Sequence, residues 1–181
     1  MSKKLEELLI KEKALEIVEN ELTPLLKDLV KDAPAHSKPH EQILEQAFRF
    51  HNLGQYQEAL PLFIELAEHG SDIGAEYAAQ YYFEGKGVEQ SYEKAAQFYL
   101  VGQKNGSLYS RFRVGYLMLY GLGLTQNIEK GLTIIEETAF MRIDEAVWCL
   151  VDLYQEGKYV EKDLEVADFW RSKVEYNIGK A

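Results

Sequence analysis

The sequence is poor in cysteine and proline. It has one cysteine and 4 prolines among 181 residues. A lone Cys149 can form no disulfide within the chain and cannot build a cysteine metal site. Its apolar neighbours favour a thiol that packs as a small hydrophobic side chain. With so few prolines, only residues 32–40, which contain Pro34 and Pro39, have the composition of a linker.

Long hydrophobic runs are also missing. No segment approaches the roughly 20 apolar residues that a membrane-spanning helix needs. The N-terminus does not resemble a secretion signal either, because Lys3 and Lys4 are followed by mixed charged and apolar residues instead of an apolar run. The sequence therefore predicts a cytoplasmic protein that does not associate with membranes.

Positive charge is scarce in residues 41–181, which make up most of the chain. The formal net charge is −10, and residues 41–181 carry −9 of it. An acidic surface gains no counterion-release free energy from a polyanion, so nucleic acid is excluded as a direct partner. A basic protein would be attracted, mainly through faster encounter. The alternative is that the acidity only keeps the protein in solution.

The sequence contains no convincing catalytic, phosphate-binding or metal-binding motif. His36 and His40 have the spacing of a metal pair, but they lie in the proline-flanked linker, where that spacing has no helical meaning. Two Gly-x-Gly fragments begin at Gly85 and Gly121, and both end helical patterns instead of opening a helix after a strand. No nucleophile, base and orienting group can be assembled. We therefore predict no metal site, no cofactor and no enzyme.

The strongest feature that is present is a repeat of 36 residues. It is visible in Gly85, Gly121 and Gly157. Two further rows with the same period are Ala59, Ala95, Gly131 and Ala167, and Leu62, Phe98, Ile134 and Trp170. A fixed period of this length indicates a repeat architecture. The small residues would let helix axes approach closely, and the glycines read as helix C-caps with positive φ.

Apolar periodicity places two helices in each repeat. The first helices are predicted over residues 41–53, 73–84, 108–120 and 144–156. The second helices are predicted over residues 56–69, 91–104, 127–140 and 163–177. One such pair cannot bury its apolar face alone, so stacking of the pairs must make the core.

The residues of the second pair resemble a Sel1-like repeat, a relative of the tetratricopeptide repeat. The resemblance rests on Ala75, Ala78, Ala79, Tyr82, Gly85, Gly87, Val88, Tyr92, Ala95, Phe98 and Gly106. The third pair has Gly131 where alanine is usual, and the fourth has Tyr159 in place of the second loop glycine. The first pair is closer to a tetratricopeptide repeat. Repeat and resemblance together predict an all-α fold, a right-handed α-solenoid of four helix–turn–helix repeats over residues 41–181.

The resemblance implies that the first helix of each pair lines a concave groove. The partner-binding residues predicted from helical spacing are Phe48, His51, Asn52, Glu76, Gln80, Phe83, Glu84, Tyr109, Phe112, Tyr116, Tyr120, Trp148, Asp152 and Glu156. The set is aromatic and acidic, and it contains no lysine or arginine. Exposed aromatics anchor interfaces, and the carboxylates would select a partner with Lys or Arg beside apolar anchors. The alternative is that part of these aromatics is core between neighbouring helices.

Residues 1–31 form an extra amphipathic helical segment before the linker. Leu8, Leu15, Leu22 and Leu29 recur every seven residues. Pro24 suits the first position of a helix, so two helices are predicted, over residues 3–21 and 24–31. The segment could cap the first repeat, pair with its copy in a homodimer, or occupy the groove. Capping is the favoured interpretation, because the ends of solenoids need a special neighbour.

The leading hypothesis for function is a protein–protein interaction module, a scaffold or adaptor, that holds a partner protein or peptide in the groove. The first alternative is an immunity-type protein that neutralises a basic toxin by covering its active site. The second, disfavoured alternative is an enzyme. Fold alone cannot separate these classes, because function resides in sites and not in the fold.

Overall fold

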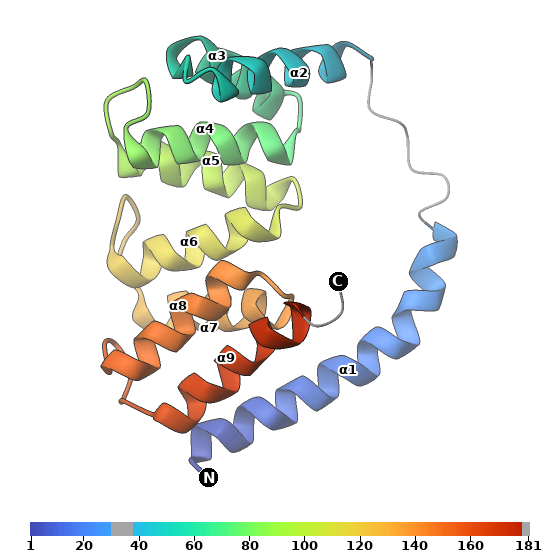
Figure 1. The fold of residues 1–181 in the computed structure, drawn as a ribbon, viewed down its shortest axis with the longest axis vertical. Coiled ribbons are helices and arrows are strands. Elements are labelled where there is room, and N and C mark those ends of the chain that lie inside the picture. Colours follow the sequence, from blue (N-terminus) through green and yellow to red (C-terminus); the bar gives the residue numbers. More distant parts are fainter. Residues whose placement is uncertain (30–37, 179–181) are drawn as a thin grey trace. The chain divides into compact units, whose positions relative to one another are not determined.

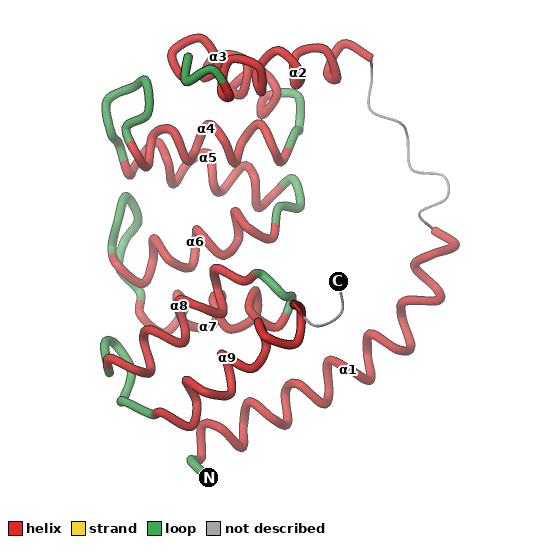
Figure 2. The backbone as a smooth tube through the Cα atoms, viewed as in Figure 1, coloured by secondary structure: helices red, strands yellow, loops and turns green. Residues whose placement is uncertain are grey.

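The computed structural model describes the backbone of residues 1–29 and 38–178, and the side chains of residues 1–16 and 40–174. These residues form helices and no strand (Figures 1 and 2). The helices are α1 (Lys3–Leu29), α2 (Lys38–Asn52), α3 (Tyr56–Glu68), α4 (Asp72–Glu84), α5 (Tyr92–Lys104), α6 (Leu108–Tyr120), α7 (Ile128–Phe140), α8 (Asp144–Glu156) and α9 (Leu164–Ile178). The predicted all-α repeat solenoid is confirmed.

The chain divides into two compact units. Residues 37–146 form one unit, and residues 1–36 together with 147–181 form the other. In the first unit, α2 to α7 follow one another as antiparallel neighbours, and each helix packs against the next (Figure 1). The bounds of α3 to α9 agree with the predicted helices to within one residue. The 36-residue period therefore located the helices correctly.

Local signals begin and end the helices of the repeats. The hydroxyl oxygens of Ser71 and Ser107 accept hydrogen bonds from the backbone N–H groups of the third residue of α4 and of α6, respectively. Such N-caps satisfy donors that the helix itself leaves free. At the other end, Gly85 and Gly121 lie in the left-handed region with φ of 71° and 69°. The predicted glycine C-caps are confirmed, and a β-branched residue there would be strained.

Small residues make the contacts between helices close. Ala59 and Ala95 are fully buried. At the crossing of α6 and α7 two glycines meet, because a β-carbon on Gly131 would lie 2.8 Å from the carbonyl oxygen of Gly115. Large side chains fill the space beside these contacts. The fully buried aromatics of this unit are Phe63, Tyr81 and Tyr99.

The N-terminal segment differs from its prediction in two ways. The structure continues α1 through Pro24 as one helix, so the predicted break after residue 21 was wrong. The surrounding leucine, lysine and glutamate residues are strong helix formers, and their preference outweighs one lost backbone hydrogen bond. α2 begins at Lys38, three residues earlier than predicted. Pro39 is tolerated there because the first turn of a helix needs no N–H donors.

The N-terminal helix has a neighbour within its own unit. Within its unit, α1 contacts α9, and Leu8 is fully buried. The amine of Lys173 on α9 lies 2.5 Å from the carboxylate of Glu12. The backbone N–H of Ser2 donates to the Glu165 carboxylate at 2.9 Å. Within its unit the segment thus packs on the helix that ends the last repeat, a neighbour that the sequence did not predict.

Candidate functional site

The first helices of the repeats in residues 37–146 lie side by side. The ring centres of Phe48 on α2 and Tyr77 on α4 are 5.0 Å apart. The guanidinium of Arg113 on α6 lies 4.1 Å from the ring centre of Phe83 on α4. We define the first-helix face as those predicted partner-binding side chains of these helices that are exposed or partly exposed, together with Arg113. Its members are Phe48, His51, Asn52, Glu76, Gln80, Phe83, Glu84, Tyr109, Arg113, Tyr116 and Tyr120.

The α2 end of this face is an aromatic cluster. Phe48 packs edge-on against Phe63 and Tyr77, with ring centres 5.6 and 5.0 Å apart. His51 stacks on Tyr81, and its Nδ1 shares a 2.7 Å hydrogen bond with the Tyr81 hydroxyl. Burial and the nearby charge of Lys86 lower the pKa of His51. Phe48 and His51 are therefore partly buried in the core, which is the alternative that the sequence left open for these aromatics.

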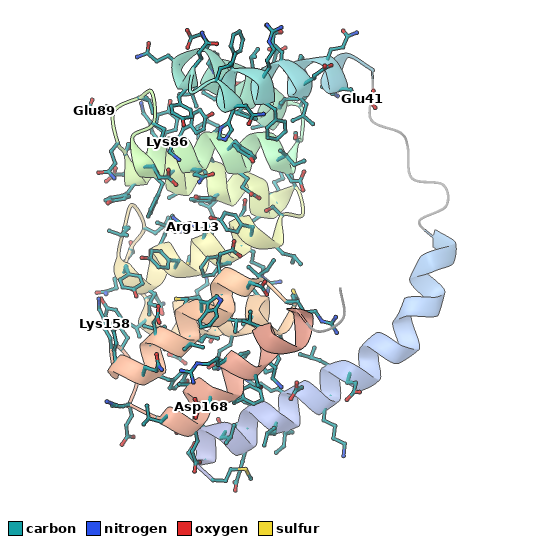
Figure 3. The ribbon with its side chains drawn as sticks, in the orientation of Figure 1. Glu41, Lys86, Glu89, Arg113, Lys158 and Asp168 are labelled. Carbon is teal, nitrogen blue, oxygen red and sulfur yellow. The ribbon has the colours of Figure 1, made fainter. Side chains whose placement is uncertain are left out.

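A polar triad lies at the C-terminal end of α4. The Glu84 carboxylate accepts a 2.8 Å hydrogen bond from the side-chain amide of Gln80 and lies 2.5 Å from the amine of Lys86. Burial opposes ionisation of Glu84, but these two partners outweigh it and lower its pKa. Lys86, labelled in Figure 3, also lies 5.8 Å from the ring centre of Tyr56. Sequence reasoning missed Lys86 because it follows the glycine that ends the helix.

Arg113 is the other residue that sequence reasoning missed (Figure 3). The partly exposed stripe of α6 runs through Tyr109, Arg113, Tyr116 and Tyr120, a regular helical spacing of four, three and four residues. The predicted stripe instead included Phe112, which is only 3% exposed and so belongs to the core. The predicted set contained no lysine or arginine, and the structure adds Arg113 to this face. The signal was present, since residue 113 fits the stripe as well as residue 112.

Carboxylates gather near the start of α4. Ser107 caps α6 with its oxygen and donates its hydroxyl proton to the Glu76 carboxylate at 3.1 Å. Burial raises the pKa of Glu76, and the charges of Asp72 and Glu145 add to the rise, although the Ser107 hydrogen bond opposes it. Ser107, the N-cap residue of one repeat, thus positions Glu76, a predicted site residue of the preceding repeat. A cation from a partner would relieve the crowding of negative charge here.

The remaining predicted site residues lie on α8, in the other unit. Trp148 is 45% exposed, and Asp152 and Glu156 follow at intervals of four residues on the same helical face. We call these three residues the α8 patch. Exposure of a tryptophan to this extent is typical of an interface anchor. The structure brings these three side chains together on one helix, and we treat them as a separate surface.

Metal-binding geometry is not found in the described part of the chain. No group of three or more His, Cys, Asp or Glu side chains there could hold an ion. The rings of His40 and His69 lie 5.1 Å apart without a third ligand, and His36 falls outside the described residues. Within the same residues, no helix has the length and apolarity to cross a bilayer.

Comparisons with known proteins agree with the repeat. The Sel1 repeat profile matches residues 74–100, 108–133 and 149–170. Among solved structures, a Sel1 repeat protein from Oxalobacter formigenes is similar, with a TM-score of 0.63 and 23% identity over 71% of this chain and 53% of that one. A protective antigen of uropathogenic Escherichia coli, c5321, which displays an SLR fold, has a TM-score of 0.55 and 26% identity.

The antigen match covers 67% of this chain and 26% of the antigen. This chain therefore spans about half of the first similar structure and a quarter of the second. A sequence comparison with curated proteins gives no match. The three repeat matches begin at α4, and the earlier α2–α3 hairpin is the one whose residues are closer to a tetratricopeptide repeat. With three Sel1 repeats in its sequence and the helical array of an SLR fold in its structure, the region of residues 74–170 belongs to the Sel1-like repeat family.

Proposed function

We propose that the first-helix face binds a segment of a partner protein. The observation that carries this proposal is the row of partly exposed aromatics Tyr109, Tyr116 and Tyr120 along α6, beside Phe83 of α4. Tyrosine rings bury a large area at low entropic cost and can still hydrogen-bond through the hydroxyl. Sel1 repeats commonly mediate protein–protein interactions, and this face supplies the kind of anchors that such interactions use.

The charges beside the aromatics favour a partner segment that carries a cation. Glu76 is crowded by Asp72 and Glu145, and its pKa is raised chiefly by burial. A lysine or arginine of the partner would lower the free energy of the ionised carboxylates when it enters this group. We infer that a basic side chain lies beside the apolar anchors of the partner.

The proposal is tested by affinity capture from the source cells with the full chain as bait. Tyr116→Ala combined with Tyr120→Ala should remove proteins that the unaltered chain captures, while the melting temperature stays nearly the same. Gln97→Ala combined with Gln103→Ala is the matched control, since both glutamines are exposed on α5. Identical captures by the tyrosine variant and the control would refute binding at the first-helix face.

The α8 patch is a second candidate surface. Trp148 supplies an exposed anchor, and Asp152 and Glu156 supply acceptors for a basic group. Trp148→Ala in the same capture experiment tests this patch by itself. Loss of the same partners as in the tyrosine variant would indicate that one partner uses both surfaces.

The net charge of −10 keeps one more specific role open. An immunity-type protein would use this charge to cover the active site of a basic toxin in the cytoplasm, with fast association at low salt. A toxin gene beside the gene for this chain would favour that role. Partners without enzymatic activity would instead favour a scaffold.

A further inference from the structure

We propose that Arg113 receives a carboxylate of the partner segment. The inference rests on the proposed function, because it names the chemistry of one contact on the first-helix face. The guanidinium lies 4.1 Å from the ring centre of Phe83, 5.1 Å from that of Tyr116 and 5.3 Å from that of Tyr99. Cation–π contacts of this kind hold an arginine without consuming its hydrogen-bond donors.

No carboxylate of the described residues forms an ion pair with Arg113. Its Nε is buried and makes no well-aligned hydrogen bond, although the Tyr99 hydroxyl interacts with the guanidinium. Arg111, two residues earlier on the same helix, pairs with Glu137 instead. A partly desolvated cation without a paired anion is costly, and a bound anion would relieve that cost.

The acidic neighbours of Arg113 are already engaged. The Glu84 carboxylate forms an ion pair with the amine of Lys86 and accepts a hydrogen bond from the side-chain amide of Gln80. The Glu76 carboxylate accepts a hydrogen bond from the hydroxyl of Ser107. Arg113 helps to lower the pKa of Glu84 through its charge, but neither carboxylate forms an ion pair with the ring-supported guanidinium. An anion from outside would not have to displace an internal partner.

A second buried polar group lies beside the guanidinium. The Tyr99 side chain is fully buried, and its hydroxyl makes no well-aligned hydrogen bond, although it interacts with Arg113. Burial raises the pKa of Tyr99, so the hydroxyl keeps its proton at neutral pH. Two buried polar atoms without well-aligned hydrogen bonds at one point of a surface are unusual in a folded protein. They support a position where a ligand completes the polar contacts.

The ligand chemistry follows from the shape and the surrounding charge. The planar fork of arginine matches a carboxylate through two parallel N–H···O bonds. The negative charges of Glu76 and Glu84 nearby disfavour a doubly charged phosphate more than a singly charged carboxylate. The carboxylate comes either from an Asp or Glu side chain or from the C-terminus of the partner.

The experiment uses the full chain and random peptides of 12 residues displayed in two formats. One format leaves the peptide C-terminus free, and the other fuses it to the carrier. Selected peptides are synthesised, and their dissociation constants are measured for the unaltered chain, Arg113→Met, Arg113→Lys and the control Arg111→Met. A side-chain source predicts acidic residues in both formats, and a terminal source predicts binders only in the free format.

We expect Arg113→Met to weaken binding roughly tenfold or more, and Arg113→Lys to weaken it less, because lysine keeps the charge but loses the fork. Arg111→Met should leave binding unchanged. Replacing the peptide carboxylate by an amide should weaken binding to the unaltered chain and have little further effect on Arg113→Met. A double-mutant cycle of this kind isolates the one contact.

The failures of the two proposals are distinguishable. Peptides that bind Arg113→Met as tightly as the unaltered chain, but lose affinity for the Tyr116→Ala and Tyr120→Ala variant, overturn the inference and leave the proposed function standing. A library without any binder overturns both. Circular dichroism of each variant checks folding, and Arg113→Lys provides the comparison if Arg113→Met is unfolded.

Discussion

Gly123 and the carbonyl oxygen of Tyr92 approach so closely that a β-carbon on residue 123 would lie 2.1 Å from that oxygen. Gly123 is the second glycine of its inter-helix loop, and its φ is 66°. The loop of one repeat thus rests on the first residue of α5 in the preceding repeat. The equivalent Gly87 is packed in the same way, because its β-carbon would lie 2.7 Å from that of Tyr56.

Gly123→Ala should destabilise the protein by about 3 kcal/mol or more, since it combines left-handed strain with overlap against backbone atoms. Gly54→Ala is the matched control. Gly54 also has a positive φ, 73°, but a β-carbon there would meet no atom within 4 Å. The control should cost about 1–2 kcal/mol. Urea denaturation measures both, and equal losses would contradict the close approach.

Tyr159→Gly should stabilise the protein by up to about 1.5 kcal/mol. Tyr159 occupies the place of the second loop glycine and adopts the same backbone conformation, with φ of 64°. Glycine removes a left-handed strain of about 1–2 kcal/mol and loses about 0.5–1 kcal/mol through the entropy of the unfolded chain. Tyr159→Ala keeps the strain and should bring no gain. A thermal melt in which both variants behave alike would argue against strain at this position.

Stability should fall on mild acidification because of His51. Burial and Lys86 hold the pKa of His51 below its ordinary value of 6.5. The unfolded chain therefore binds a proton at higher pH than the folded chain. The contribution is fully present above pH 6.5 and is lost as the pH falls from 6.5 toward the folded pKa. Urea denaturation at pH 7.5, 6.5 and 5.5 should show this loss in the unaltered chain.

The His51 contribution is isolated by substitution. His51→Gln should reduce the loss of stability between pH 7.5 and 5.5, while His69→Gln should leave it in place. His69 is exposed, and its Nδ1–H donates to the backbone carbonyl of Glu65 at 2.7 Å. An unchanged pH profile in His51→Gln would assign the effect to other groups.

Glu76→Gln should raise stability at pH 7 and weaken the binding of a basic partner. Burial, together with Asp72 and Glu145, raises the pKa of Glu76. The folded chain thus holds the proton more tightly than the unfolded chain, and the stability gained from protonation is lost as the pH rises through 4.5 and then through the folded pKa. Glutamine avoids the charge and can still accept the hydrogen bond of Ser107.

Urea denaturation at pH 7 and pH 4 tests the direction of this pH dependence. The gain from Glu76→Gln should be present at pH 7 and reduced at pH 4. Glu89→Gln, at an exposed loop residue, is the control and should change little at either pH. A stabilisation of equal size at both pH values would show that charge is not its cause.

The helices were predictable because their signals repeat. Glycines 36 residues apart marked three C-caps, and periodic apolar residues located the helices between them. The site was harder to predict from one sequence. Phe112 and Arg113 are adjacent, so a rotation of about one residue decides which of them faces solvent. Tertiary packing buries Phe112, and a single helical pattern does not contain that information.

The N-terminal segment shows a different limit. Its leucine repeat correctly indicated an apolar helical stripe, but helical propensity outweighed Pro24, and the neighbour of the stripe was not encoded in the segment itself. Leu8 is buried in the unit that contains α9. Which end of a repeat array a helix covers depends on a surface far away in the sequence. Local patterns therefore cannot decide it.

The hairpins of α4 to α7 carry their own start and stop residues. Ser71 and Ser91 begin the two helices of one hairpin, Ser107 and Asn127 begin those of the next, and a glycine separates the helices within each. A gene duplication or deletion of 36 codons would thus leave every helix end intact. Such arrays can change in length over evolution by whole hairpins, and their recognition surface can grow or shrink without redesign of the rest.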